Sequence, residues 1–295
     1  METIIETDVI NIAIQGGTGA FHEMAACKFF DSRDISINPC ETFEDVFFDL
    51  TAGKSDCGIV AIENSVAGSI LPNYALLRRS GLKIAGEVYL RIRQNLMALP
   101  GESIENLTEI HSHPVAIQQC NVFLEDFRRR GVKIVETSDT ALSAKWISDN
   151  KLSGIGALAS SLAAEIYNLE ILAEEVEADK RNFTRFLMVT GNDKMLAAHQ
   201  VISHDVDKAS LCFSLPHEVG SLSQILSVLA FYNVNLTKIQ SLPIVGKTWE
   251  YLFHIDLVFT DYQRYRQALS AIGPLTDHLE IFGEYKQGEM PEEED

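Results

Sequence analysis

Hydrophobic residues in the first two thirds of the chain fall into short blocks that are typical of alternating strands and helices. Ile10–Gln15 alternates apolar residues with polar or small ones, and this alternation predicts a strand. The strand ends at Gly16–Gly19, a turn in which the backbone can come close to a ligand. The residues that follow predict a helix, because one face collects the apolar side chains of Phe21, Met24, Ala25 and Phe29.

A second apolar block, Cys57–Ile62, is bounded by polar residues and predicts a strand buried on both faces of a parallel sheet. It leads directly into three polar residues, Glu63, Asn64 and Ser65. In open α/β sheets the ligand crevice lies outside the carboxyl ends of the strands. The pattern therefore favours a binding role for these three residues over a plain loop.

Another predicted strand, Leu107–His111, is followed by Ser112, His113 and Pro114. Proline at the first helical position is a helix-start signal, and the free N–H groups of a helix start can receive an anion. Ser112 and Gln119 are seven residues apart and lie roughly on one side of the predicted helix. Two alternatives stay open: Ser112 simply caps the helix, and His113 is a helix-start residue and not an acid. The predicted apolar face of this single helix consists of Ala116, Cys120, Phe123, Leu124 and Phe127.

Further strands are predicted at Val132–Val135, Ile155–Ala159 and Phe186–Val189, with helices between them. Strands that alternate with helices indicate an α/β architecture. Ser138 or Asp139 is a suitable cap for the helix after the first of these strands.

A chain of 295 residues is too long for a single hydrophobic core, so more than one domain is expected. The helix and strand pattern fades after the last of these strands and resumes with a βαββαβ order. We therefore predict the following division: a catalytic region of two lobes over 9–190, a linker over 191–207, a small separate domain over 208–284, and a disordered acidic tail over 285–295.

Composition narrows the possible partners. The net charge of −18 argues against nucleic acid, whose phosphates require a basic surface. An anionic small substrate is still compatible if a few arginines form a basic island in one cleft. The five cysteines include no CxxC pair, which favours buried reduced thiols over disulfides or zinc. Neither a signal peptide nor a membrane span is visible, so a cytoplasmic location is expected.

The segment Asn182–Phe186 (NFTRF) opens an apolar strand with a polar and cationic cluster. The guanidinium of Arg185 is suited to hold a carboxylate through two parallel hydrogen bonds. The alternative for a lone Thr-Arg pair is an ordinary surface salt bridge.

Three segments in the same order and spacing resemble the prephenate dehydratase family: CGIVAIENSVAGSI, HSHPVAIQQC and NFTRF. The resemblance implies a two-lobed catalytic domain similar to periplasmic binding proteins. It also implies decarboxylative dehydration of prephenate to phenylpyruvate in phenylalanine biosynthesis. This reaction requires no cofactor and no metal, which agrees with the absence of a GxGxxG fingerprint in the glycine-rich turn.

The resemblance assigns Thr184 to the departing hydroxyl group. Whether Thr184 gives up its proton or only donates a hydrogen bond stays open. The implied substrate-binding residues are Glu63, Asn64, Ser65, Ser112, Gln119, Arg185 and Phe186. The chain departs from the family at the glycine-rich turn, where Ala20 and His22 replace two hydroxyl residues, and at Gln94, where many relatives have histidine.

The C-terminal segments HEVGSLSQIL and NVNLTKIQSLP resemble an ACT domain, a ferredoxin-like module that in this family binds phenylalanine at a subunit interface. The implied effector-binding residues are Gly220, Ser221, Leu222, Asn235, Gln240, Ser241 and Pro243. The segment Gln240–Pro243 lacks the acidic and arginine side chains of the family motif, which weakens the expected affinity. A homodimer or a homotetramer is expected, because such a module usually pairs through an exposed sheet edge.

Two other functions are compatible with the sequence. Arogenate dehydratase differs only in an amino group on the substrate side chain, and no sequence pattern separates it from prephenate dehydratase. A non-catalytic amino-acid sensor is the second alternative, because two-lobed folds and ACT domains both bind amino acids. The Thr184–Arg185 pair beside the segment Glu63–Ser65 favours the enzyme.

Overall fold

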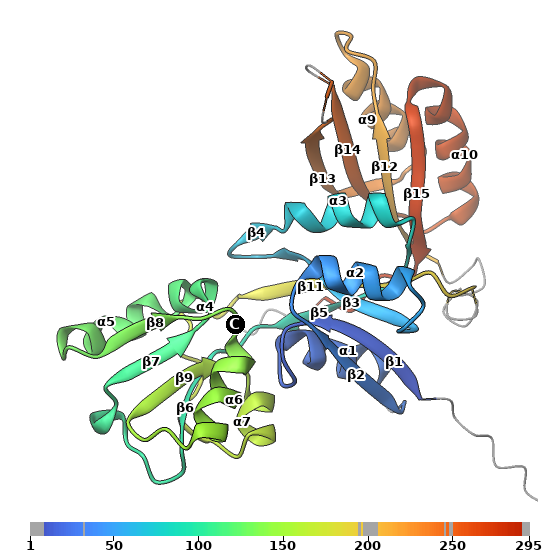
Figure 1. Ribbon diagram of the computed structural model, residues 1–295. Helices are drawn as coiled ribbons and strands as arrows, with labels where there is room; N and C mark the ends of the chain where they lie inside the picture. Colours follow the sequence, from blue (N-terminus) through green and yellow to red (C-terminus); the bar gives the residue numbers. More distant parts are fainter. Residues whose placement is uncertain are drawn as a thin grey trace, which may run out of the picture. The chain divides into compact units, whose positions relative to one another are not determined.

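A computed structural model describes the chain over residues 9–31, 33–193, 196, 206–244, 246–247 and 250–290. The chain forms two compact units: the first comprises residues 1–76, 88–187 and 290–295, and the second comprises 77–87 and 188–289. The predictions for the N-terminal segment, most of the linker and the end of the acidic tail lie outside the described residues, as does the start at Trp249 of a strand predicted over 249–259. Figure 1 labels the elements in chain order.

The first lobe of the catalytic region is built on a six-stranded sheet of order β2-β1-β3-β11-β5, with β4 paired to β3. β1 is parallel to both β2 and β3. The side chains of Ile12, Ala13 and Ile14 are fully buried, because the central strand β1 is covered on both faces. The strands are β1 (Ile10–Gln15), β2 (Ile35–Cys40), β3 (Cys57–Asn64), β4 (Gly68–Ser69), β5 (Lys83–Arg91) and β11 (Phe183–Thr190).

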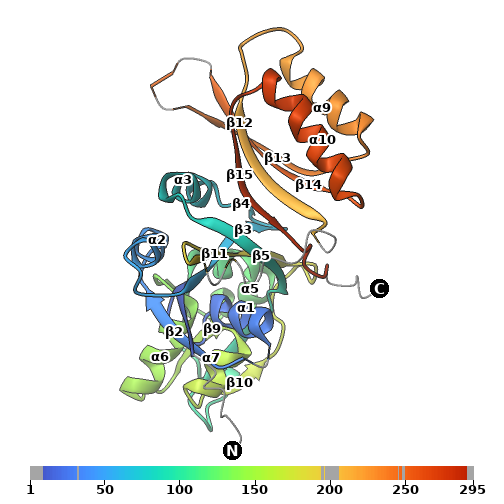
Figure 2. The same cartoon turned by 90° about the vertical axis from the view of Figure 1, so that its right-hand side faces the viewer.

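Helices cover both faces of this sheet. The connection from β1 to β2 contains α1 (Phe21–Phe30), and the connection from β2 to β3 contains α2 (Phe43–Thr51). These crossovers run in opposite directions along the sheet, so right-handed connections place the two helices on opposite faces, as Figure 2 shows. α3 (Leu71–Ser80) follows the β3–β4 hairpin.

The second lobe is a five-stranded sheet of order β10-β6-β9-β7-β8 between two layers of helices. Successive residues of β6 point to opposite faces: Leu96 packs with Leu124 of α5, and Met97 packs with Ala144 of α6. The single helix predicted after Pro114 is two helices, because the backbone leaves helical geometry at Cys120. The elements are β6 (Asn95–Ala98), η1 (Ile104–Asn106), β7 (Glu109–Ser112), α4 (Pro114–Gln119), α5 (Asn121–Arg129), β8 (Lys133–Glu136), α6 (Thr140–Asn150), β9 (Ile155–Ala159), α7 (Ser161–Ile166) and β10 (Glu170–Ala173).

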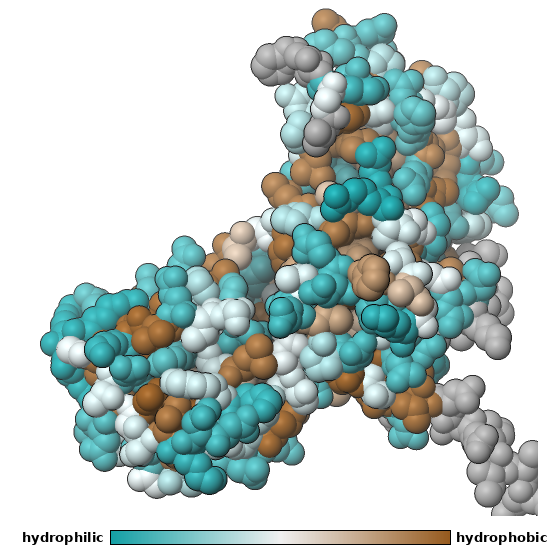
Figure 3. All heavy atoms as spheres, viewed as in Figure 1, coloured by the Kyte–Doolittle hydropathy of each residue, from teal (hydrophilic) through white to brown (hydrophobic). Residues whose placement is uncertain are grey.

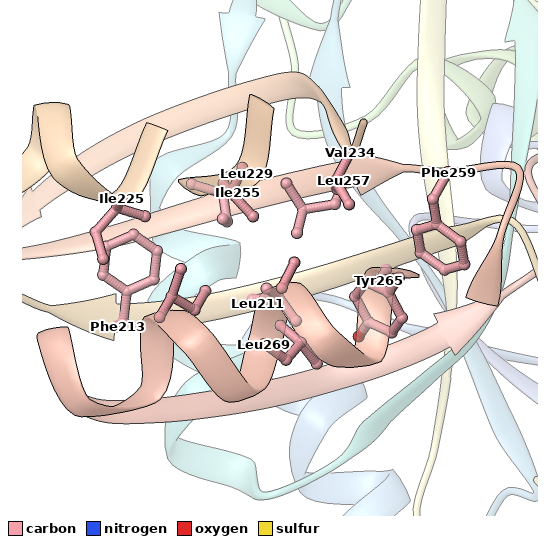
Figure 4. Close-up of a cluster of buried hydrophobic side chains, with 13 residues drawn as sticks. Leu211, Phe213, Ile225, Leu229, Val234, Ile255, Leu257, Phe259, Tyr265 and Leu269 are labelled. Atoms are coloured by element: carbon pink, nitrogen blue, oxygen red, sulfur yellow. The ribbon is translucent and has the colours of Figure 1, made fainter. Parts of the chain in front are cut away.

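The C-terminal part of the second unit has the predicted βαββαβ order and an antiparallel sheet of order β13-β14-β12-β15. Both helices cover one face of the sheet (Figure 2), and Leu211, Phe213 and Ile255 pack there against Ile225 and Leu269 (Figure 4). This arrangement is ferredoxin-like, as predicted. Its elements are β12 (Lys208–Ser214), α9 (Ser221–Phe231), β13 (Asn235–Pro243), β14 (Tyr251–Val258), α10 (Tyr262–Ile272), η2 (Gly273–Leu275) and β15 (Asp277–Tyr285).

On the second face of this sheet β12 is buried, because residues 83–87 of the same unit contact β12 and β15, whereas alternate residues of β13 are exposed. The Lys208 ammonium lies 2.8 and 2.9 Å from the two carboxylate oxygens of Glu87, and both side chains are almost fully buried. A Cβ atom at Gly283 would lie 2.1 Å from the carbonyl oxygen of Ile84, so only glycine fits there. The domain boundaries predicted from the sequence stay predictions.

The five free cysteines differ in exposure: Cys57, Cys120 and Cys212 are buried, Cys40 is intermediate and Cys27 is exposed. The prediction that the cysteines are buried is therefore wrong for Cys27 and only partly met by Cys40. Figure 3 shows a mostly hydrophilic surface over α5, although Val122 at its start is exposed. Among the described helices, none is long and apolar enough to cross a membrane.

Candidate active site

A cavity of about 490 Å³ lies between the two lobes of the first unit. This volume is in the range that holds a small-molecule ligand. The first lobe contributes wall residues from the end of β1 and the starts of α1 and α2, and also from the β3–β4 hairpin and β11. The second lobe contributes the start of α4 and the residues around the start of α6.

Two chain segments cross between the lobes at the base of this cavity, one over 92–94 and one over 174–182. The backbones of the two segments are joined by hydrogen bonds from Ile92 N to Asn182 O at 2.7 Å and from Val176 N to Gln94 O at 2.8 Å. The Glu175 carboxylate also forms ion pairs with Arg91 and Arg93. Gln94 therefore lies both in a connection between the lobes and in the wall of the cavity.

The glycine-rich turn Gly16–Gly19 approaches the second lobe. Ser160 Oγ donates to the carbonyl of Gly19 at 2.5 Å, and the Tyr167 hydroxyl donates to the carbonyl of Thr18 at 2.7 Å. Gly19 has φ +88°, and a Cβ atom there would lie 2.8 Å from Ala163 Cα. The structure shows a close approach of this turn to helix α7, and its predicted approach to a ligand stays a prediction.

A buried hydrogen-bond network connects the β3 end to the β11 start. Asn64 Nδ2 donates to Thr184 Oγ1 at 2.9 Å and to Asn182 Oδ1 at 2.7 Å. Asn64 Oδ1 accepts from the backbone N–H groups of Val66 and Ala67 at 3.0 and 2.7 Å. The network joins side chains that are 118 and 120 residues apart in sequence.

Four of the predicted site residues lie together in the cavity wall: Asn64, Gln119, Thr184 and Phe186. The other four, Glu63, Ser65, Ser112 and Arg185, are not wall residues of this cavity.

Ser65 and Ser112 make hydrogen bonds that hold strands together. Ser65 Oγ accepts from Phe183 N at 2.9 Å and donates to Arg181 O at 2.7 Å, which joins β3 to β11. Ser112 is fully buried and donates to Leu158 O at 2.7 Å. The alternative that Ser112 caps the helix after it is wrong, because the residue that caps α4 is His113, whose Nδ1 accepts from Val115 N.

Arg185 is buried in β11 between two residues that face the cavity, Thr184 and Phe186. Successive side chains of a strand point to opposite faces, so the side chain of Arg185 leaves β11 on the face away from the cavity. The cavity wall in the described residues contains no lysine or arginine, and its acidic members are Glu44 and Asp139. The basic island expected for an anionic substrate is therefore not found in this wall.

The polar groups of the wall are mostly neutral hydrogen-bonding groups. Burial lowers the pKa of His22 to about 4, so its imidazole is neutral near pH 7. Its ring meets Phe43 and Phe186 edge to face, and its Nε2 is buried without a hydrogen-bond partner in the described chain. Gln94 Oε1 is likewise buried without a partner. Burial raises the pKa of Asp139, which caps α6 by accepting from Leu142 N at 2.8 Å. No group of three His, Cys, Asp or Glu among the described residues is arranged to hold a metal.

Sequence reasoning missed the wall segment Thr42–Glu44. The available signal was a capping box, in which Thr42 Oγ1 accepts from Asp45 N and the Asp45 carboxylate accepts from Thr42 N. This box starts α2 and so brings Phe43 to the cavity.

Gly220, Ser221 and Leu222 follow the end of β12, and Gln240, Ser241 and Pro243 lie at the end of β13 on the same side of the ferredoxin-like sheet. Asn235 is the first residue of β13 and lies at the opposite end of the sheet, next to Val258, so it is not brought together with the other six predicted effector residues. Gly220 has φ +88° and precedes the first residue of α9, Ser221. In the strand register Ser214 pairs with Leu252, which pairs with Leu242, so the loop after β12 and the end of β13 are two strands apart. That separation is about 10 Å. The end of β12, from which the chain continues to Gly220, therefore lies near the Gln240–Pro243 end of β13, and the binding role of both effector segments stays a prediction.

The fold and the cavity define a class: a two-lobed α/β protein that encloses a small molecule between its lobes, followed by a ferredoxin-like domain. The model of the prephenate dehydratase family matches residues 12–194. A bifunctional chorismate mutase/prephenate dehydratase of Aquifex aeolicus is 32% identical over 96% of this chain and 75% of its own length. Arogenate dehydratase 2 of Petunia hybrida is 36% identical over 94% of this chain and 71% of its own length. The chain belongs to the prephenate dehydratase family, and it is a dehydratase of the carbon–oxygen lyase class.

Solved structures support the same architecture. A prephenate dehydratase from Arthrobacter aurescens in complex with L-phenylalanine has a TM-score of 0.78 at 26% identity and covers 94% of this chain and 90% of its own. GqqA, described as a quorum-quenching acylase, has a TM-score of 0.80 at 28% identity and covers 94% of this chain and 98% of its own. The predicted two-lobed catalytic region with a C-terminal ferredoxin-like domain is confirmed.

Proposed function

We propose that the cavity between the lobes carries out the decarboxylative dehydration of prephenate to phenylpyruvate. The observation that carries this proposal is the buried Thr184 hydroxyl, which lies in the wall of the cavity and is held there by Asn64. The wall also contains Phe186, Phe43 and Ile70, whose apolar surfaces suit a six-membered carbon ring.

The reaction requires little covalent chemistry from the protein. The bond from the ring to the carboxylate carbon breaks, carbon dioxide leaves, and the electron pair enters the ring. The bond from C4 to the hydroxyl oxygen breaks at the opposite end of the ring, and the oxygen leaves with its electron pair as hydroxide, which takes up a proton to become water. Thr184 donates a hydrogen bond to this developing hydroxide, since a preorganised donor acts where charge develops in the transition state.

The experiment replaces Thr184 with alanine and with serine. Thr184→Ala should lower kcat about a hundredfold, which is the typical effect of one lost donor to developing negative charge. Thr184→Ser should keep most of the activity, and the exposed Thr51→Ala is the matched control. The formation of phenylpyruvate is followed spectrophotometrically. Unchanged turnover in Thr184→Ala would remove this hydroxyl from the mechanism.

Arogenate is the second candidate substrate, and one observation favours it. Arogenate carries an ammonium group on its side chain, which would be attracted by the Glu44 and Asp139 carboxylates in a wall without lysine or arginine. Prephenate instead requires its two carboxylates to be held by neutral donors such as Gln119. Kinetics with both purified substrates distinguish the two, and the ratio of their kcat/KM values decides the physiological substrate.

Phenylalanine is the proposed effector, bound by the C-terminal domain in its role as an ACT domain. The support is that the chain reaches the turn at Gly220 from the end of β12, two strands from the Gln240–Pro243 end of β13, and that backbone N–H groups at the start of α9 suit a carboxylate. Activity is measured with increasing phenylalanine, in the wild type and in Gly220→Val. Inhibition should weaken in the variant, and an unchanged rate at millimolar phenylalanine in the wild type would reject the effector.

A homodimer or homotetramer is proposed through the edge strand β13. β13 pairs only with β14 in the described sheet, and its exposed Ile239 lies on this edge element. Unpaired N–H and C=O groups at a sheet edge pair readily with a second copy. Light scattering on the purified chain gives the mass, and a monomer at micromolar concentration would reject this assembly.

A further inference from the structure

Asn64 was expected to contact the substrate, but its amide is occupied by the protein. Its Oδ1 accepts from two backbone N–H groups, those of Val66 and Ala67. Backbone N–H groups are donors only, so the atom that they approach must be the oxygen, and the orientation of the amide is fixed. The NH₂ group of Asn64 must therefore face Thr184 and Asn182.

The fixed amide determines how the Thr184 hydroxyl is used. A threonine hydroxyl has one proton to donate and lone pairs that accept. Asn64 Nδ2 donates to Thr184 Oγ1 at 2.9 Å, so this bond occupies a lone pair and leaves the proton available. Thr184 and Asn64 are both wall residues of the cavity and both nearly buried, which keeps bulk water away from the bond.

We infer that Asn64 is a positioning residue for the reaction: it directs the proton of the Thr184 hydroxyl toward the cavity. The tight β3–β4 turn supplies the two N–H groups that orient Asn64, and Asn64 in turn orients Thr184. This inference rests on the proposed function, because it gives the reason why a threonine hydroxyl, a poor acid in water, serves as a preorganised donor.

The test is Asn64→Asp, which keeps the shape but exchanges the NH₂ group for an acceptor oxygen. The Thr184 proton should then turn to the introduced carboxylate and be lost to the substrate. We expect kcat to fall about a hundredfold with KM changed less than threefold. The exposed Asn106→Asp is the matched control and should retain full activity.

Two further measurements separate positioning from damage to the structure. First, the ratio of variant to wild-type kcat should rise as the pH falls below the pKa of the introduced carboxyl, because a protonated carboxyl can again donate to Thr184. The use of the ratio cancels the titration of Glu44, Asp139, His22 and His113 in the wall and of Glu63 on the same strand. Second, Asn64→Asp should change kcat less than twofold in a Thr184→Ala background, since Asn64 acts through that hydroxyl.

Asn64→Ala is the second variant in case the aspartate variant does not fold, and thermal unfolding monitors both. It removes the orienting donor without adding a competing acceptor, so kcat should fall about tenfold in the wild-type background and less than twofold in Thr184→Ala. Equal losses in both backgrounds, or a pH-independent ratio for a folded Asn64→Asp, would overturn the positioning role. If Thr184→Ala itself keeps wild-type turnover, the proposed function of Thr184 fails instead, so the two failures are distinguishable.

Discussion

The half-buried histidine in the cavity wall, whose Nε2 is fully buried, gives a prediction for the pH dependence of stability. Burial lowers the pKa of His22 from 6.5 to about 4. Between these values the unfolded chain binds more protons than the folded one, so stability is complete above pH 6.5 and falls as the pH falls toward 4. With these two pKa values, the linkage relation gives a loss of about 2 kcal/mol between pH 7 and pH 5 from this single residue.

His22→Asn removes the titrating group, so the variant should lose about 2 kcal/mol less than the wild type over the same interval. Urea unfolding at pH 7 and at pH 5 measures the free energy of unfolding of each protein, with one m-value used for both proteins. His254 in the second unit also has its pKa lowered to about 4 by burial and is left unchanged in both proteins. His217→Asn, on an exposed loop, is the matched control. An identical pH dependence in wild type and His22→Asn would refute the assignment of a neutral buried imidazole.

Two other substitutions test how the fold holds the site and the second unit. Gly19→Ala should destabilise the chain by about 2–4 kcal/mol and lower activity, because Gly19 has a positive φ and a Cβ atom there would overlap Ala163. Gly53→Ala is the control: Gly53 also has a positive φ, but a Cβ atom there would lie within 4 Å of no other atom, so the substitution should cost about 1–2 kcal/mol. Lys208→Met should cost about 3–5 kcal/mol in thermal or urea unfolding, because the buried Glu87 carboxylate loses its ammonium partner. Lys54→Met removes an exposed ammonium 3.8 Å from Asp49 and should cost under about 1 kcal/mol, because Asp49 keeps its hydrogen bonds from Asn38 and Ser55. Equal effects of the two lysine variants would contradict the burial argument.

Local patterns in the sequence were sufficient for most of the architecture. The strand β1 has the predicted bounds Ile10–Gln15, and β9 has the predicted bounds Ile155–Ala159. The order βαββαβ was also readable, because each of its elements has its own period of apolar residues. Segments without such a period, such as Ile35–Cys40, were not assigned, and the structure shows a strand there with only partly buried residues.

The site was only partly predictable. Adjacent residues of a strand cannot share a face, so Thr184 and Arg185 could not both reach the cavity once β11 was found to begin at Phe183. From the sequence the strand was expected to start at Phe186, so Thr184 and Arg185 were expected to lie together in one polar cluster before it. Helical spacing predicted that Ser112 lies near Gln119, but Ser112 is the last residue of a strand and its hydroxyl donates a hydrogen bond to the carbonyl of Leu158.

The sequence by itself determined the family, the alternation of strands and helices, and the residue types available for chemistry. The tertiary structure alone decided which of them meet, because the bond between Asn64 and Thr184 spans 120 residues and depends on how β3 and β11 lie in the sheet. It also decided that the glycine-rich turn meets Ala163 of the second lobe, since close packing between segments far apart in sequence has no local signal. Backbone periodicity is a property of neighbouring residues, whereas a site is a property of the segments that packing brings together.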